Sequence, residues 1–360
     1  MMVSGNGKLR VGILFGGRSA EHEVSLQSAR NVYDAIDRDR FEPVLIGIEK
    51  SGKWRLADDS ISLLNPGETV AMIPEKGSLY GLQSDSVSTT TRNLGLDVVF
   101  PILHGPFGED GTVQGLLKLA DVPFVGSGVL GSAVGMDKDV MKRLFRDAGM
   151  PIGKFITLRS HMPPPPFAEV EAELGCPVFV KPANMGSSVG VSKVHGADEF
   201  SAAIGEAFQY DTKIIVEEYI QGREIECAVL GNENPVASVT GEITPSHEFY
   251  SYDAKYLDDN GAALAIPAKI NDESAKRIQS LSVKAFQVLG CEGLARVDFF
   301  LRENGEIIIN EINTMPGFTQ ISMYPKLWEA SGIGYTELIS RLIALAIERF
   351  ERERGLRTSR

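Results

Sequence analysis

The sequence predicts an α/β fold with more than one domain, and three observations support this. At 360 residues the chain is long enough for two or three domains, and its 43% hydrophobic content supports real cores. Near the N-terminus, apolar runs over residues 9–15 and 43–48 flank a segment in which Ala29, Val32 and Ile36 repeat at helical spacing. This pattern predicts a βαβ unit. Near the C-terminus, residues 294–317 contain two apolar runs joined by Asn-Gly, which predicts a β-hairpin.

Composition excludes several classes of partner. The net charge of −12 argues against nucleic acid or an anionic membrane as partner, because both need clustered Lys and Arg. Cys176, Cys227 and Cys291 are widely spaced and outside any CxxC pattern, so we expect free thiols, each a small buried residue, in a reducing compartment. The N-terminal residues lack the apolar core of a signal peptide, and we expect a cytoplasmic protein.

The predicted hairpin brings polar residues together. If Asn304 and Gly305 form a two-residue turn, Asp298 faces Glu311 and Arg296 faces Asn313. Side chains alternate along a strand, so these four share one face. The same face is predicted to carry four apolar residues: Leu294, Phe300, Ile307 and Ile309.

Two interpretations of this face are open. Opposed carboxylates about 5 Å apart repel each other unless a cation lies between them. Oxygen donors without His or Cys suit a hard ion such as Mg²⁺. The alternative is an ion-pair cluster in which Arg296 neutralises Asp298. We favour the metal site, because one arginine leaves Glu311 uncompensated in apolar surroundings.

The turn after the first strand, GGRSAEHEVS, precedes a predicted helix. We expect Ser19 or Ser25 to cap this helix. Local pattern alone makes Glu21 and Glu23 partners of the helix dipole. The turn lacks GxGxxG, so a dinucleotide fingerprint has little support.

The next segments predict sheet edge, strand and loop. Residues 51–96 lack periodicity, and we expect variable loop and edge structure. Residues 97–103 predict a strand whose carboxyl end carries His104, Glu109 and Asp110, at the edge where open α/β sheets bind ligands. A hydrogen-bonded structural histidine is an equal alternative for His104. We expect a further strand at residues 123–126 and a first domain boundary near residue 129.

The following region predicts a glycine-rich flap. A strand at residues 177–181 places Lys181 on the face opposite Val178 and Val180, and the loop ANMGSSVG leads to a strand at 191–194. Backbone N–H groups of such a loop can fold over phosphates. The sequence does not satisfy GxxxxGK[ST], which excludes a Walker-type P-loop.

Acidic residues gather where two further strands, 213–219 and 224–230, meet: Glu217, Glu218, Glu224 and Glu226. They offer acceptors for ribose hydroxyls or an adenine amino group, and the alternative is a charged edge that resists aggregation. Residues 244–267 form a long segment without periodicity that contains Tyr250, Tyr252, Lys255 and Tyr256, and we expect a lid. Residues 272–289 and 335–350 predict helices.

Seven stretches together resemble the D-alanine:D-alanine ligases of the ATP-grasp superfamily: GGRSAEHEVSLQSA, HGPFGEDGTVQG, GSGVLGSAVGMDKDVMK, VFVKPANMGSSVGVSKV, YDAKY, ARVDFF and INEINTMPGFT. The resemblance covers nearly the whole chain. It implies three α/β domains, which we place at residues 1–129, 130–222 and 223–360, with ATP between the second and third. It also implies ATP and two Mg²⁺ or Mn²⁺ ions as cofactors, D-alanine as substrate and a homodimer.

The resemblance implies roles for individual residues around the nucleotide. Lys138 and Lys181 contact ATP phosphates. The loop from Gly186 to Gly190 closes on them. Glu217 and Glu224 hold adenine and ribose. The remaining positions are the loop residues Ser187, Ser188 and Val189 and the metal ligands Asp298, Glu311 and Asn313.

Further roles concern the amino acids. Glu21 anchors the ammonium of the first D-alanine, against its local interpretation as a dipole partner, and Ser187 and Tyr256 complete a hydrogen-bonded set with it. Arg296 and the Gly317 N–H stabilise charge on the tetrahedral intermediate. The residues assigned to substrate binding besides Glu21 are His104, Lys255, Ser322 and Met323, the last two at the carboxylate of the second D-alanine.

The implied reaction has two steps. The carboxylate of the first D-alanine attacks the γ-phosphate, and the amine of the second attacks the resulting acyl phosphate.

Three other functions are alternatives to this one. A D-alanine:D-lactate ligase is the nearest alternative, and Lys255-Tyr256 argues against it. A nucleotide-binding module without turnover is disfavoured by the intact hairpin residues, and a dehydrogenase by the missing glycine fingerprint.

Overall fold

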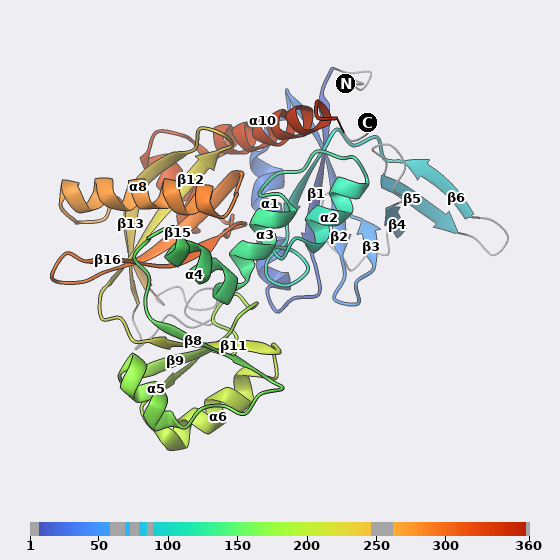
Figure 1. The fold of residues 1–360 in the computed structure, drawn as a ribbon. Helices are drawn as coiled ribbons and strands as arrows, with labels where there is room; N and C mark the ends of the chain where they lie inside the picture. The colour runs from blue at the N-terminus through green and yellow to red at the C-terminus, as the bar shows by residue number, and fades with distance from the viewer. Residues whose placement is uncertain (1–6, 58–68, 73–78, 85–88, 246–261, 358–360) are drawn as a thin grey trace.

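Three β-sheets with helices packed between and around them make up the computed structural model (Figure 1). The structure describes residues 7–57, 69–72, 79–84, 89–245 and 262–357. The described helices are α1 His22–Ala35, α2 Thr112–Leu119, α3 Val129–Met136, α4 Lys138–Asp147, α5 Phe167–Leu174, α6 Ala197–Ala207, α8 Asp272–Val288, α9 Met323–Ala330 and α10 Tyr335–Arg354.

The first sheet has the strand order β6-β5-β4-β3-β2-β1-β7 in the part of the chain that is described. Its strands are β1 Leu9–Gly16, β2 Phe41–Ile48, β3 Trp54–Leu56, β4 Thr69–Met72, β5 Leu79–Ser84, β6 Thr89–Asn93 and β7 Val98–Ile102. β1 pairs in parallel with β2 and β7, which confirms the predicted βαβ unit. The strands β3 to β6 extend the sheet outward in antiparallel pairs, so the expectation of edge structure there is confirmed in part.

Two details of this region differ from the predictions. Residues 123–126 form no strand. Their pairing with β7 is limited to one bridge, between Phe124 and Val99. Neither Ser19 nor Ser25 caps α1. Ser25 Oγ instead accepts from Gly16 N at 2.8 Å and donates to Ile102 O, so it joins the ends of β1 and β7.

The second sheet is antiparallel, with the order β10-β9-β11-β8. Its strands are β8 Phe155–Arg159, β9 Val178–Pro182, β10 Ser192–Val194 and β11 Lys213–Glu218. Apolar residues of α5 and α6 pack on one face, where Val178 and Val180 are fully buried. Lys181 lies on the other face, as predicted, and so is directed away from this core.

The third sheet is also antiparallel, with the order β14-β13-β12-β15-β16. Its strands are β12 Arg223–Gly231, β13 Val236–Pro245, β14 Ala262–Ala265, β15 Gly293–Leu301 and β16 Ile307–Asn313. One face forms a core with α8 and with Met141 and Phe145 of α4. The domain boundaries near residues 129 and 222 stay predictions. Helix α4 falls within the predicted central domain, 130–222, but it packs on this third sheet.

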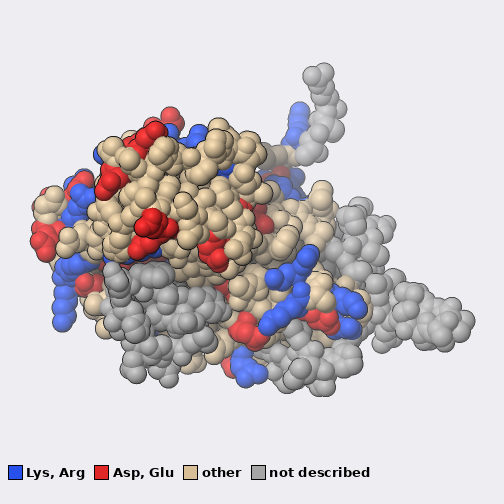
Figure 2. All heavy atoms as spheres, turned by 90° about the horizontal axis from the view of Figure 1, so that it is seen from below, with Lys and Arg blue, Asp and Glu red and all other residues tan. Residues whose placement is uncertain are grey.

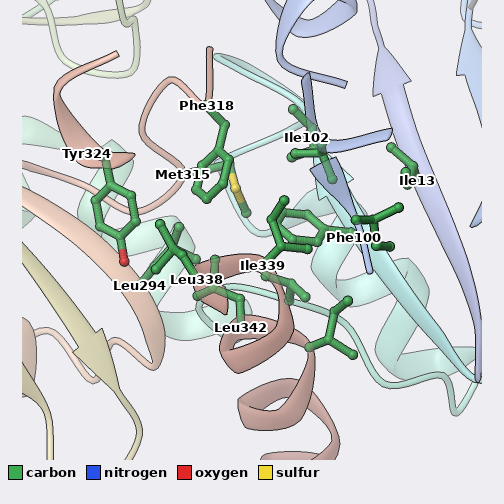
Figure 3. Packing of buried hydrophobic residues seen from close by; sticks show 14 of the residues in the cluster. Ile13, Phe100, Ile102, Leu294, Met315, Phe318, Tyr324, Leu338, Ile339 and Leu342 are labelled. Atoms are coloured by element: carbon green, nitrogen blue, oxygen red, sulfur yellow. The ribbon is translucent and has the colours of Figure 1, made fainter. Parts of the chain in front are cut away.

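A continuous core joins the first and third sheets. Apolar residues of β1, β7 and α1 pack with the C-terminal helix α10, which crosses from one sheet to the other (Figure 1). Figure 3 shows Phe318 and Met315 within this core, beside Phe100 and the α10 residue Ile339. The segment around residue 317 is therefore held by both sheets.

The cysteines agree in part with expectation. Cys176, Cys227 and Cys291 are free; the last two are buried, whereas Cys176 is exposed, contrary to expectation. On the face shown in Figure 2, described Lys and Arg side chains lie beside Asp and Glu rather than in one continuous basic area. In the described ranges no single helix is long and apolar enough to cross a bilayer; only α9 and α10, bent by 104°, meet that test as a pair.

Candidate active site

The hairpin of β15 and β16 carries the polar face that the sequence predicts. Asp298 faces Glu311 and Arg296 faces Asn313, so the predicted pairing is confirmed at these positions. Asn313 Nδ2 donates a hydrogen bond to Asp298 Oδ2 at 2.9 Å. The four polar side chains therefore lie on one face of two neighbouring strands.

The turn of this hairpin is not the predicted two-residue turn. Arg302 N donates to Glu306 O at 2.9 Å, which leaves a three-residue loop at 303–305. Gly305 has a φ of +83°, the left-handed conformation that closes such loops. Further along, a bulge places Asn310 opposite no partner and adds the residue that restores the predicted register.

The bulge also reverses the face of two isoleucines. Ile307 and Ile309 pair with Leu301 and Phe299 and are buried in the core beneath α8. The prediction that they share the polar face is wrong. Fewer apolar side chains therefore surround the carboxylates than expected.

Arg296 is the centre of a buried cluster with two carboxylates, which we call the Arg296 cluster (Arg296, Glu226 and Asp298). Its Nε and Nη2 donate to the two oxygens of Asp298, both at 2.7 Å, and Nε lies 2.9 Å from Glu226 Oε2. Burial acts against the guanidinium charge, but the two carboxylates outweigh it and raise the pKa of Arg296. The ion pair that we gave as the alternative is thus present, and Glu226 belongs to it.

A second buried cluster lies where α4, β9 and β11 meet. Lys142 Nζ lies 2.7 Å from Glu217 Oε1, and Lys181 forms an ion pair with Glu217 Oε2. The side chains of Lys142 and Lys181 are only 3% and 12% exposed. Two ammonium groups therefore share one carboxylate, and we call these three residues the Glu217 cluster.

The pKa values of the Glu217 cluster follow from its charges. Burial acts to raise the pKa of Glu217, but Lys142 and Lys181 overcome it and hold that pKa below its ordinary value. Burial, with the neighbouring Lys181, lowers the pKa of Lys142. For Lys181, Glu217 and Glu311 outweigh burial and raise the pKa. The carboxylate is therefore ionised at neutral pH.

Lys138, the first residue of α4, lies between the glycine-rich loop and the hairpin carboxylate Glu311. Its Nζ donates to Met185 O at 2.7 Å and lies 3.6 Å from Glu311 Oε2. Lys142 comes one helical turn later and so lies on the same side of the helix. Lys138 was predicted from the sequence and Lys142 was not, although the spacing of four residues in MDKDVMK places both lysines on one side of a helix.

Ion pairs at the start of α4 fix the orientation of this helix. Asp137 caps the helix by accepting from Val140 N at 3.0 Å, and it also pairs with Lys213 of β11. Asp139 Oδ2 lies 3.4 Å from the same ammonium, and its Oδ1 accepts from Thr157 Oγ1 at 2.8 Å. The helix is thus tied to β11 and β8, which directs its lysines toward Glu217 and Glu311.

The glycine-rich loop has the predicted position between β9 and β10. Ser187 and Ser188 have φ values of +50° and +61°, which are uncommon outside glycine, and Val189 N donates to Gly186 O at 3.1 Å. Ser187 Oγ donates to Glu21 Oε1. The loop is therefore held in a tight conformation against the first residues of α1.

Glu21 approaches this loop closely. Its side chain is buried, and a Cβ at Gly186 would lie 3.0 Å from Glu21 Oε2. The contact with Ser187 is the one that the resemblance implies, and the role of Glu21 in holding the ammonium of D-alanine stays a prediction. Tyr256, expected to join Glu21 and Ser187, lies outside the described residues, as do Lys255, Tyr250 and Tyr252.

Glu218 and Glu224, near the junction of β11 and β12, have different neighbours from Glu217. Glu218 Oε1 accepts from Lys154 N at 2.8 Å, so it stabilises the chain before β8. Glu224 is half-buried in β12, opposite Phe300 of β15. Of the four acidic residues predicted at this junction, Glu217 is the one that contacts the buried lysines.

His104 lies between the first and third sheets. Its Nδ1 is 3.1 Å from Met315 O and its Nε2 is 3.3 Å from Ser28 Oγ. Burial lowers its pKa, so the ring is neutral at neutral pH. These contacts favour the structural alternative, and its assignment to the substrate stays a prediction. Nearby, burial and then Glu21 raise the pKa of Glu109 to about 8.

Gly317 lies between two anchored residues, Met315 and Phe318, which are 3% and 0% exposed. A Cβ at Gly317 would lie 3.0 Å from Ser322 Oγ, so glycine permits this close approach. Ser322 and Met323 lie at the start of α9, where helix N–H groups favour an anion. The backbone at Gly317 is thus placed beside the predicted carboxylate site.

A small cavity of about 30 Å³ lies between these parts. Its lining combines the α4 lysine, the glycine-rich loop and the hairpin carboxylate: Glu109, Lys138, Met185, Gly186, Glu311 and Asn313 are among its residues. A larger cavity of about 360 Å³ lies between α10 and the starts of β1 and β2, and its described lining residues include none of the predicted site residues. The small cavity marks the place where the predicted phosphate and metal ligands meet.

The comparisons with known proteins agree with one another. The family model "D-ala D-ala ligase N-terminus" matches residues 10–127, and "D-ala D-ala ligase C-terminus" matches residues 144–344. The chain is 55% identical to D-alanine–D-alanine ligase A of Escherichia coli K12, over 98% of this chain and 99% of that protein. It is 54% identical, with the same coverage, to the D-alanine–D-alanine ligase of Oceanobacillus iheyensis.

Solved structures give the same result. The D-alanine-D-alanine ligase from Coxiella burnetii superposes with a TM-score of 0.86 at 37% identity, over 97% of this chain and 96% of that one. The VanG D-Ala:D-Ser ligase from Enterococcus faecalis has a TM-score of 0.83 at 37% identity, over 94% and 99%. The fold is therefore the ATP-grasp fold that the sequence analysis expected, and this chain belongs to the D-alanine–D-alanine ligase family.

Proposed function

We propose that this chain uses ATP to join two molecules of D-alanine into D-alanyl-D-alanine, for the synthesis of peptidoglycan precursors. Family membership supports the reaction. The structural observation that carries it is the convergence of two lysines, Lys138 and Lys181, each with a side chain only 12% exposed, beside the glycine-rich loop of a chain whose net charge is −12. Buried positive charge of this kind suits a polyphosphate.

We assign the nucleotide site to the groups around these lysines. Lys138 and Lys181 bind the phosphates, while N–H groups of the loop at 186–190 cover them. Glu217 accepts a hydrogen bond from the adenine amino group, and Glu224 accepts from the ribose. The short distance between Lys138 and the loop carbonyl of Met185 supports this placement.

The hairpin face has the donor chemistry of a divalent-cation site. Asp298, Glu311 and Asn313 offer carboxylate and amide oxygens from adjacent strands, the ligand type that Mg²⁺ or Mn²⁺ prefers. In the described ranges no group of three or more His, Cys, Asp and Glu could hold a metal, so an amide must complete this set. When bound, the ions neutralise charge on the transferring phosphoryl group.

We assign the first D-alanine to Glu21, with Ser187 and Tyr256 completing the set that holds its ammonium. The hydrogen bond between Glu21 and Ser187 supports this site. We assign the carboxylate of the second D-alanine to the start of α9, at Ser322 and Met323, and we also assign Lys255 and His104 to substrate binding. The N-terminal N–H groups of α9 support an anion there.

The residues then act in two steps. Lys138 and Lys181 neutralise the γ-phosphate while the carboxylate of the first D-alanine attacks it, which breaks the bond to the β,γ-bridging oxygen, releases ADP and gives an acyl phosphate. The amine of the second D-alanine attacks the acyl carbonyl, and phosphate leaves. Arg296 and the Gly317 N–H stabilise the oxyanion that forms. The loop at 186–190 and the segment 244–267 exclude water, which would hydrolyse the acyl phosphate.

We also propose that the domains meet near residues 129 and 222, with ATP between the second and third, and that the enzyme is a homodimer. The separate helical cover of the second sheet supports the central domain. Size-exclusion chromatography with light scattering measures the oligomeric state directly.

Phosphate release from ATP tests the reaction. We expect release with D-alanine and Mg²⁺, and little release with L-alanine or without Mg²⁺. D-serine and D-lactate serve as alternative second substrates, each with D-alanine present. Product analysis should give D-alanyl-D-alanine as the main product at neutral pH. Release that is independent of D-alanine, or a depsipeptide as the main product, would contradict the proposal.

A further inference from the structure

Lys142 is the most deeply buried member of the Glu217 cluster. Its side chain is 3% exposed, and its Nζ lies 2.7 Å from Glu217 Oε1. The ring of Phe155, which pairs with Glu217 across β8 and β11, has its centroid 5.9 Å from the same ammonium. The helix that carries Lys142 is tied to β11 by Asp137 and Lys213. Lys142 therefore has little freedom to leave Glu217.

The charge balance separates the roles of the two lysines. Lys142 and Glu217 alone form a neutral pair, so Lys181 is the surplus cation of the cluster. Lys181 precedes the glycine-rich loop and is more exposed than Lys142. When Lys181 binds phosphate, Glu217 still has Lys142 as its counter-ion. A buried glutamate without any counter-ion would take up a proton instead.

We propose that Lys142 is a positioning residue that sets the base specificity of the nucleotide site, because it keeps the Glu217 carboxylate ionised and directed at the base while Lys181 holds phosphate. The inference rests on the proposed nucleotide site. An ionised carboxylate only accepts hydrogen bonds, so it selects a base with an exocyclic amino group and repels a carbonyl oxygen at the same position. Adenine carries that amino group, and hypoxanthine carries the oxygen.

The test compares ATP with ITP in Lys142→Met. We expect the native enzyme to favour ATP strongly. The variant should raise KM for ATP by about 10-fold or more and reduce the ATP-to-ITP preference by a similar factor, the size expected for one charge-assisted hydrogen bond. Its kcat at saturating ATP should stay within about threefold, because Lys142 touches no reacting group. Lys142→Arg should restore most of the preference, since it keeps the charge.

Arg146→Met is the matched control. Arg146 lies on the same helix, and its guanidinium carbon is also 5.9 Å from the Phe155 centroid, but it is exposed. Both variants remove a cation near the same ring, and only Lys142→Met removes a contact with Glu217. We expect Arg146→Met to keep the native ATP-to-ITP ratio.

A double-mutant cycle with Glu217→Gln shows whether Lys142 acts through Glu217. In the Glu217→Gln background, Lys142→Met should change the preference by less than about twofold. The double variant also removes both charges, so it remains testable if Lys142→Met alone fails to fold. An unchanged ratio in Lys142→Met, or an equal effect in both backgrounds, would overturn the inference.

Nucleotide binding, measured without turnover, tests this inference independently of the proposed reaction. Calorimetry with ADP and IDP measures base preference without turnover. Loss of preference in Lys142→Met supports the inference even if the native protein makes no D-alanyl-D-alanine, an outcome that would remove the proposed reaction alone. An equal preference for ADP over IDP in native protein and variant would overturn the inference whatever the ligase assay gives.

Discussion

Two buried ion clusters in this protein have opposite charge balance. In the Glu217 cluster, two lysines share one carboxylate. In the Arg296 cluster, one arginine is shared by Glu226 and Asp298. Glu311, which lies 3.6 Å from Lys138, interacts electrostatically with Arg296 of one cluster and with Lys181 of the other. The first cluster has a surplus positive charge, and the second has a surplus negative charge.

The difference indicates what each cluster binds. A buried charge without a counter-ion is costly, so a surplus persists where a ligand of the opposite sign completes the set. A surplus of ammonium groups beside a glycine-rich loop suits phosphate. A surplus of carboxylates on a strand hairpin suits a divalent cation. ATP with Mg²⁺ supplies both.

The largest expected effect comes from the carboxylate next to the Arg296 cluster. Glu311→Gln should reduce turnover by about 1,000-fold at saturating ATP, because it weakens a metal site worth several kcal/mol of charge stabilisation. Glu306→Gln is the control, since Glu306 lies in the same hairpin but pairs with Arg302 at the surface. Steady-state phosphate release measures both. Near-native activity of Glu311→Gln at high Mg²⁺ would contradict the metal assignment.

The surplus cation of the other cluster should have the next largest effect. Lys181→Met should lower kcat/KM for ATP by about 100-fold, within the range for removing one partner of a buried charged contact. Lys193→Met on β10 removes a lysine that stacks on Tyr219, with Nζ 4.8 Å from the ring centroid, and should have little effect. If Lys181→Met kept its kcat/KM within about twofold of native, Lys181 would not bind phosphate.

Stability should distinguish the clusters further. Arg296→Met leaves two buried carboxylates without their cation and should lower the free energy of unfolding by about 3 to 5 kcal/mol. Lys142→Met should lower it by only about 1 to 2 kcal/mol, because Glu217 keeps Lys181. Urea unfolding followed by tryptophan fluorescence compares the midpoints of the same transition. Equal destabilisation by the two variants would show that charge balance does not govern these clusters.

The smallest effect is a pH dependence. The pKa of Glu217 lies below its ordinary value of 4.5 in the folded protein. Its stabilisation is therefore present above that value and lost as the pH falls through the folded pKa. From about pH 5 downward, toward the folded pKa, Glu217→Gln should lose less stability than the native protein does. Parallel urea midpoints across this interval give the comparison, and identical slopes would argue against an ionised Glu217.

The hairpin shows how far sequence can predict this site. The pairing of Asp298 with Glu311 was predicted correctly, but through two errors that cancel. The turn has three residues instead of two, and the bulge at Asn310 adds the missing residue. An Asn-Gly pair also occurs in three-residue loops, and no local sequence signal marks the bulge. Because of this bulge, the sequence pattern could not predict which face of the sheet Ile307 and Ile309 occupy.

Tertiary contacts explain the remaining differences. The apolar pattern predicted α1, α4, α8 and α10 and the strands β1, β2, β7, β9 to β12, β15 and β16, because each buries a regular face. It did not predict α2, α3, α5, α6, α9, β3 to β6, β8 or β13, and β14 lies within the segment 244–267 that was expected to lack secondary structure. Lys142 was missed because its importance depends on a partner, Glu217, that lies in a different element. Ser25 bonds to strand ends rather than capping α1, and residues 123–126 make only an isolated bridge, at Phe124. These contacts depend on residues that are distant in the sequence.

The most direct test of the two-cluster account is a crystal structure with Mn²⁺ and a non-hydrolysable ATP analogue. Anomalous scattering locates the manganese. The account predicts manganese within about 2.0 to 2.4 Å of oxygens from Asp298, Glu311 and Asn313. It also predicts that Lys181 moves from Glu217 to phosphate while Lys142 stays on Glu217. Manganese elsewhere, or phosphate held without Lys181, would contradict it.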